Sequence, residues 1–131
     1  MTAVDTNVLV RLLTGDQADQ AAAARSLFMS ESIWIAKTVL LETDWVLRSL
    51  YGYGDSAIHD ALTRVLGLEN VHAEDEPAVA QALALAKHGM EFADALHLSS
   101  RPADAAFVSF DKMLLRDAKR AGVRGVSTIP I

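Results

Sequence analysis

Hydrophobic and polar positions alternate along the chain between short apolar runs and longer stretches with helical spacing, as is typical of an α/β domain. Five short runs predict strands: Ala3–Val4, Ile33–Ala36, Val71–Ala73, Ala105–Phe110 and Val126–Ile129. Seven longer segments predict helices: Val8–Leu13, Ala18–Met29, Thr38–Tyr51, Asp55–Leu66, Pro77–Lys87, Asp94–Ser100 and Lys112–Ala121. Helix therefore dominates the predicted structure.

Residues with strong conformational preferences mark the ends of several of these segments. Thr38 is expected to cap the N-terminus of its helix, and Pro77 suits the first turn of another. Gly15 and Gly122 are expected to end the helices that precede them.

Composition places the chain among globular proteins with a single folded domain. The 131 residues are 51% hydrophobic, and the mean hydropathy of +0.20 excludes disorder for the bulk of the chain. We expect one domain over residues 1–131 and, in the absence of a long apolar run, no membrane association. Because there is no cysteine, disulfides, thiolate zinc sites and cysteine nucleophiles are excluded. A cysteine-free chain suits a reducing compartment, so we expect a cytoplasmic protein.

The charge balance leaves the kind of partner open. Twelve Lys and Arg against 17 Asp and Glu give a formal net charge of −5, which argues against binding to nucleic acid. That argument weakens if some of the acids hold divalent cations, because bound cations reverse the local field that a phosphate meets.

Two aspartates follow predicted strands and precede predicted helices. Asp5 and Asp111 occupy these positions, and ligands of open α/β sheets bind at the carboxyl ends of the strands. Each is either a helix N-cap or part of a charged site at one edge of the sheet. Two carboxylates at such an edge raise each other's pKa unless a cation binds.

Glu42 has no cation within helical reach, since the neighbours three and four positions away are apolar or threonine. Asp44, in contrast, precedes Arg48 by four residues, which is the spacing of an ordinary exposed ion pair. Glu42 is therefore either at a solvated rim or held by something outside its helix, such as a metal ion.

Asp94 is expected to begin a short helix, with His97 three residues later on the same face. His97 is either a second metal ligand or a packed, hydrogen-bonded histidine that orients the helix. A site made of carboxylate oxygens favours Mg²⁺ or Mn²⁺ over zinc. The hydroxyls of Thr6 and Ser109 are candidates to support the aspartates beside them or to cap helices.

The last predicted helix carries a stripe of basic residues. Its members are Lys112, Arg116, Lys119 and Arg120. The stripe is either a solvated helix face or, because it directly follows Asp111, a contact for a phosphate backbone.

Four segments together resemble the PIN-domain nucleases, and particularly the short VapC-type toxins. They are Asp5-Thr6-Asn7-Val8-Leu9-Val10-Arg11, Glu42, Phe92-Ala93-Asp94-Ala95-Leu96-His97-Leu98 and Val108-Ser109-Phe110-Asp111. The similarity covers essentially the whole chain, and the length also fits.

The resemblance implies a three-layer α/β/α sandwich with a mainly parallel central sheet. It also implies an endoribonuclease that uses Mg²⁺ or Mn²⁺ to activate water, with RNA as its substrate and a small VapB-type antitoxin as its partner. The positions that match the family's acidic metal-binding and catalytic quartet are Asp5, Glu42, Asp94 and Asp111. Ser109 stands where the family often has threonine, and Asp117 is the candidate for a further acid. Glu42 is either a ligand or the base that orients the attacking water.

The helix predicted to start at Thr38 has apolar residues almost all round, including Leu40, Trp45, Leu47 and Leu50. This helix is either buried on both sides or presents a homodimer surface or a groove for the antitoxin. Two further functions are open to the chain: a PIN-like nuclease of RNA processing without an antitoxin, and a non-catalytic module that binds RNA or protein. A phosphoacceptor receiver domain is disfavoured because Asp5 has no acidic neighbour.

Overall fold

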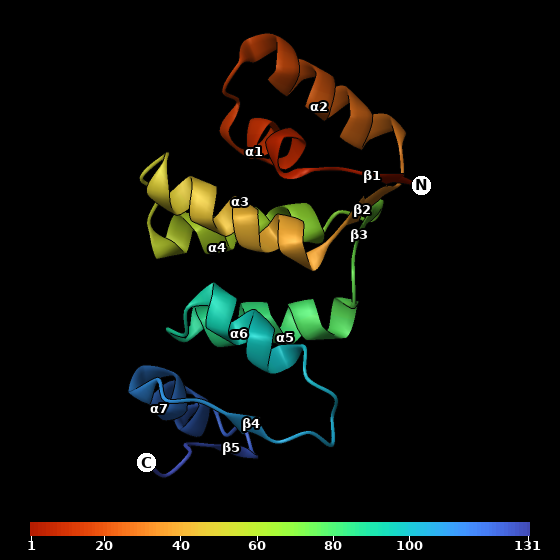
Figure 1. Cartoon of the computed structure of the whole chain (residues 1–131). Helices are drawn as coiled ribbons and strands as arrows, with labels where there is room; N and C mark the ends of the chain where they lie inside the picture. The colour runs from red at the N-terminus through yellow and green to blue at the C-terminus, as the bar shows by residue number, and fades with distance from the viewer. The chain divides into compact units, whose positions relative to one another are not determined.

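The computed structural model describes all residues from Met1 to Ile131 and divides them into two compact units, 1–76 and 77–131. We refer to them as unit 1 and unit 2 (Figure 1). Unit 1 contains β1 (Thr2–Ala3), α1 (Thr6–Thr14), α2 (Ala18–Ser30), β2 (Ile33–Ile35), α3 (Lys37–Ser49), α4 (Asp55–Leu66) and β3 (Val71–Ala73). Unit 2 contains α5 (Glu76–Lys87) from Pro77 onward, α6 (Phe92–Ser99), β4 (Phe107–Val108), α7 (Lys112–Arg120) and β5 (Val126–Ser127). The expectation of one domain over residues 1–131 stays a prediction.

All strands pair in parallel, which confirms the α/β/α class with a parallel sheet. In unit 1 the strand order is β1-β2-β3, with Ile33 paired to both Thr2 and Val71. In unit 2 β4 pairs with β5, and Phe107 lies opposite Val126. The last two strands are shorter than the apolar runs predicted. β4 ends at Val108 because the residues after it already form the cap of α7.

The core of unit 1 is built around β2 and α3. Ile33 and Ile35 are fully buried and alternate with the half-buried Trp34, as expected for a central strand. On α3 the buried positions Leu40 and Leu47 form a single narrow stripe, while Trp45 and Leu50 are 58% and 68% exposed. The prediction that this helix is buried on both sides is therefore wrong.

The start of α3 also differs from the prediction of a Thr38 cap. The helix begins at Lys37, and Ala36 is its N-cap residue without a side-chain hydrogen bond. The Lys37 backbone N–H instead donates to Glu74 Oε1 at 3.0 Å, a residue that follows β3. A tertiary contact thus meets a need that sequence reasoning assigned to a local hydroxyl. The glycine ends are confirmed, with Gly15 and Gly122 in the left-handed region at φ +72° and +74°.

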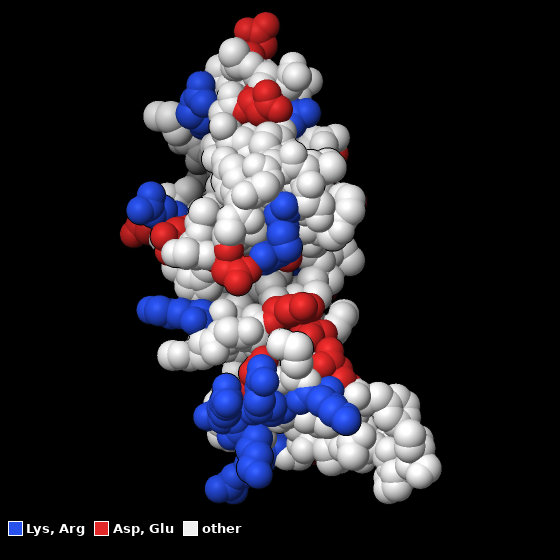
Figure 2. Space-filling view, turned by 90° about the vertical axis from the view of Figure 1, so that its left-hand side faces the viewer, with Lys and Arg blue, Asp and Glu red and all other residues white.

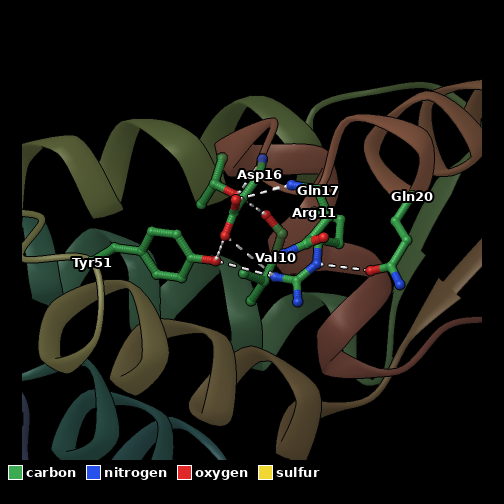
Figure 3. Close-up of polar contacts among 7 residues, drawn as sticks. Val10, Arg11, Asp16, Gln17, Gln20 and Tyr51 are labelled. Atoms are coloured by element: carbon green, nitrogen blue, oxygen red, sulfur yellow. Dashed lines mark hydrogen bonds and ion pairs between the residues drawn. The ribbon is translucent and has the colours of Figure 1, made fainter.

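A polar cluster ties α1 to the segment that follows α3 (Figure 3). Arg11 Nη1 donates to the Tyr51 hydroxyl at 3.1 Å, and that hydroxyl donates to Asp16 Oδ2 at 2.7 Å. Arg11 Nε donates to Gln20 Oε1 at 2.9 Å, which extends the cluster into α2. The hydrogen bond from Tyr51, with a second from the Gln17 N–H, lowers the pKa of Asp16. The cluster therefore fixes α1 relative to the end of α3.

The role of Tyr51 gives the first prediction. In Tyr51→Phe the pKa of Asp16 rises toward its ordinary value, because the largest stabilisation of the ionised carboxylate is lost. An NMR pH titration of the Asp16 carboxyl measures this change, with Tyr53→Phe as the aromatic control that leaves the pKa in place. A lowered folded-state pKa stabilises the fold at higher pH, so the stability gap between wild type and Tyr51→Phe narrows as pH falls through the pKa of Asp16. An unmoved Asp16 titration in Tyr51→Phe contradicts the assignment.

Candidate metal centre

In unit 1, Asp5 joins the end of β1 to the start of α1. Its backbone is extended and its Oδ1 accepts a hydrogen bond from the Val8 N–H at 3.1 Å, so the N-cap interpretation is confirmed. The bond occupies one carboxylate oxygen, and Oδ2 accepts no hydrogen bond. The cap therefore orients the exposed side chain and leaves one oxygen for another partner.

Glu42 is connected to this junction through Thr6. The Thr6 side chain is buried, and its Oγ1 donates a hydrogen bond to Glu42 Oε1 across 36 residues of sequence. Glu42 is itself exposed on α3 and has no Lys or Arg partner. The partner expected from outside its helix is thus Thr6, whose hydroxyl supports Glu42 and not the adjacent Asp5. Asp44 pairs with Arg48 at 3.1 Å, as the spacing predicted.

In unit 2, Asp111 repeats the arrangement of Asp5. Its Oδ1 accepts hydrogen bonds from the N–H groups of Met113 at 2.9 Å and Leu114 at 3.2 Å, and Oδ2 accepts none. Ser109 Oγ accepts a hydrogen bond from the Asp111 N–H at 3.0 Å. Ser109 therefore supports the backbone of Asp111, whereas the sequence suggested support of the carboxylate or of a bound water.

Asp94 is the third residue of α6, which begins at Phe92 and not, as predicted, at Asp94. Burial raises the pKa of Asp94, and the negative charges of Asp111 and Asp117 raise it further, while His97 opposes the shift. Asp117, which sequence reasoning proposed only as a further acid, thus lies in the field of Asp94. His97 is exposed, so the prediction of a packed histidine is wrong.

The four candidate acids have no Lys or Arg partner, whereas five of the other 13 carboxylates have one. The carboxylates within 4.0 Å of a Lys or Arg nitrogen are Asp16, Asp44, Asp55, Asp75 and Asp117, and none of the four candidate acids is among them. Carboxylate oxygens without a cationic partner are chemically suited to a divalent cation. No three acidic or histidine side chains in the structure lie close enough together to hold one ion. Asp5 and Glu42 form the acidic group of unit 1, and Asp94 and Asp111 that of unit 2.

A basic face follows the unit 2 acids along α7. Figure 2 shows Lys and Arg side chains gathered over this helix. All four predicted members are exposed, and at about 100° per residue they lie opposite the buried Leu114 and Ala118. At the end of α7 a cavity of ≈ 560 Å³ is lined by Arg120 and Asp117 together with Gln81 and His88 of α5.

Parallel strands followed by unpaired carboxylates define an α/β domain with an acidic centre. The chain belongs to the PIN domain family, whose sequence pattern matches residues 2–120. PIN domains are generally nucleases, hydrolases that typically use divalent metal ions. A comparison with curated proteins finds no match to the chain. None of the helices combines the length and the hydropathy needed to span a membrane.

The raised pKa of Asp94 gives a second prediction. A carboxyl whose pKa is raised by folding costs stability when ionised, so its favourable contribution is present at low pH and lost as pH rises through the folded-state pKa. Metal-free Asp94→Asn is therefore more stable than wild type at pH 7, and the difference disappears in acid, where Asp94 is protonated. Urea unfolding across this pH range measures the effect. Asp104→Asn, in an exposed turn, is the control, and an equal gain in both variants contradicts the prediction.

Proposed function

We propose that this protein is a metal-dependent endoribonuclease, the VapC-type toxin of a type II toxin-antitoxin system. The proposal rests on the four acids that match the acidic quartet of the PIN-domain nucleases. Asp5, Glu42, Asp94 and Asp111 are unpaired by cations, and Asp5 and Asp111 are each held by one oxygen with the other left over. Membership of the PIN domain family supports a nuclease, and the resemblance to the short VapC-type toxins supports RNA as the substrate.

The chemistry follows from the donor set. The carboxylate oxygens of Asp5, Asp94 and Asp111 are the proposed donors to Mg²⁺ or Mn²⁺, and a divalent ion bound at these acids would activate water and offset charge on the scissile phosphate. Glu42 is either a further ligand or the base that orients the water, and the Thr6 hydroxyl fixes its orientation in both roles. When water attacks phosphorus and the bond to the 3′ oxygen breaks, the products carry a 5′-phosphate and a 3′-hydroxyl.

The basic face of α7, formed by Lys112, Arg116, Lys119 and Arg120, is proposed to bind the RNA backbone. The same proposal includes a VapB-type antitoxin, a homodimer and a cytoplasmic location. The exposed Trp45 of α3, with the exposed Leu50 directly after the helix, supports a protein partner, because aromatic side chains are enriched at such surfaces. A neighbouring reading frame for a small DNA-binding protein would distinguish the toxin from a PIN-like nuclease of RNA processing.

Cleavage of structured cellular RNA by the purified chain, freed of any partner, tests the function. We expect discrete cuts in Mg²⁺ or Mn²⁺ and none in EDTA. Asp5→Asn, Glu42→Gln, Asp94→Asn and Asp111→Asn each reduce the rate by more than the roughly 10- to 100-fold that loss of an outer-shell partner costs. Asparagine caps a helix as well as aspartate does, so the two capping variants remove charge without removing the cap.

Asp104→Asn is the matched control and retains full activity. Loss of cleavage in all four variants with retention in this control supports the proposal. Metal-independent cleavage contradicts it, and so does full activity of any one of the four. Binding of RNA without cleavage in either metal favours the non-catalytic module.

Thr6 gives a separate prediction because it contacts Glu42 and not the substrate. Thr6→Val removes the donor and lowers the cleavage rate by about 10- to 100-fold, whereas Thr6→Ser keeps the hydroxyl and restores most of the rate. The Mg²⁺ concentration for half-maximal cleavage, measured alongside the rate, separates weakened metal binding from slower chemistry. Equal losses in the valine and serine variants would instead indicate a packing role for Thr6.

A further inference from the structure

Of the four phenylalanines in the chain, Phe110 is the one whose side chain is exposed to solvent. Phe28 and Phe92 are buried and Phe107 is half-buried, whereas Phe110 and the nearby Met113 are each 63% exposed. Exposure of a large aromatic ring gives no folding benefit, because its apolar area stays in water. The exposed ring of Phe110 is therefore better explained by contact with a binding partner than by packing within unit 2.

The neighbours of Phe110 along the chain indicate what its ring meets. It directly precedes Asp111, the N-cap of α7, and stands two residues before Lys112, the first basic residue of that helix. Met113 flanks the basic face on the side toward Asp117, as the helical repeat of 3.6 residues places it. An exposed ring thus immediately precedes the N-cap aspartate of the helix that carries the basic face, and an exposed thioether flanks that face.

A flat apolar ring beside a cationic track is the combination that binds single-stranded nucleic acid. Bases stack on aromatic rings and phosphates contact Lys and Arg, whereas bases of a duplex are already stacked and paired. The basic face extends over the nine residues of α7, a rise of about 12 Å, which covers a short run of nucleotides. Charge complementarity with phosphates favours this occupant over a second protein surface.

We propose that Phe110 is a stacking platform for an unpaired base of the RNA substrate, next to the scissile site, with the following phosphates along the basic face of α7. The inference rests on the proposed nuclease function and adds to it the residue that contacts a base beside the cut. Phe110 is a specificity-determining residue in this arrangement, since it touches a base and not the reacting phosphate.

Binding measured without cleavage tests the inference. Fluorescence anisotropy of the full chain in EDTA, with a labelled unstructured RNA of about ten nucleotides, is compared with the same sequence as a duplex. We expect tighter binding of the single strand. Phe110→Leu, which keeps apolar volume but loses the ring, weakens single-strand binding by about 5- to 100-fold, and Phe110→Tyr restores it.

Salt dependence separates stacking from charge. In Lys112→Ala/Arg116→Ala the slope of log K against log salt decreases by about 1.4, since each lost phosphate contact removes about 0.7 on a single strand. In Phe110→Leu the slope is unchanged. Met29→Ala, another exposed apolar side chain, is the control that alters neither affinity nor slope.

Three outcomes would overturn the inference. The first is wild-type affinity in Phe110→Leu, and the second is equal affinity for duplex and single strand. The third is a Phe110→Leu variant that melts at lower temperature or loses self-association while its RNA affinity stays normal, which would make Phe110 a protein contact. Cleavage in Mg²⁺ is measured separately from RNA binding in EDTA. Failure of the stacking inference therefore leaves the nuclease proposal standing, and absence of cleavage does not by itself contradict stacking on Phe110.

Discussion

The junction between a parallel strand and the helix that follows it is the constraint on which the acidic groups of unit 1 and of unit 2 each depend. A helix begins with N–H groups that lack intrahelical partners, and a side-chain oxygen at the N-cap meets part of that need. Asp5 and Asp111 do so after β1 and β4, each through Oδ1 alone. The same hydrogen bonds that start α1 and α7 therefore orient a carboxylate at the end of a strand. The capping hydrogen bonds thus both stabilise the first turn of each helix and fix the position of a charged oxygen.

This arrangement concentrates negative charge that the fold does not neutralise. The Lys and Arg side chains that form ion pairs contact other carboxylates, namely Asp16, Asp44, Asp55, Asp75 and Asp117. The pKa of Asp94 is raised by burial and by the negative charges of Asp111 and Asp117, and no Lys or Arg lies close enough to Asp94 to offset them. Carboxyl groups whose ionised form destabilises the fold are typical of functional sites. At such sites a bound ligand, here a divalent cation, offsets the loss of folding stability.

Sequence patterns were sufficient for the class of fold and for most elements, because periodicity, glycine stops and apolar runs act locally. α4 (Asp55–Leu66) and β3 (Val71–Ala73) match the predicted bounds. Errors arose where a distant residue decides the outcome. Glu74 replaces Thr38 at the start of α3, and Thr6 reaches Glu42 across the unit.

The candidate site residues could likewise be predicted where local contacts decide their role, and could not where distant contacts do. The capping roles of Asp5 and Asp111 could be predicted as one of two alternatives, since the cap lies within three residues of the aspartate. The field of Asp117 at Asp94 and the exposure of Phe110 depend on tertiary placement, for which the sequence has no periodic signal.

The net charge of −5 does not decide whether this chain binds RNA, because exposed charges act over about 8 Å at physiological ionic strength. Within that range the residues after Asp111 present cations, and the acids before them are suited to a cation of their own. A bound divalent ion would change the sign of the field at the start of α7 and make it continuous with the basic face. Metal binding and RNA binding are then coupled: the ion removes the local repulsion that phosphates would meet at Asp94 and Asp111. The acidity that argues against RNA binding is thus confined to the carboxylates, and an ion bound there would strengthen the binding that the basic face provides without metal.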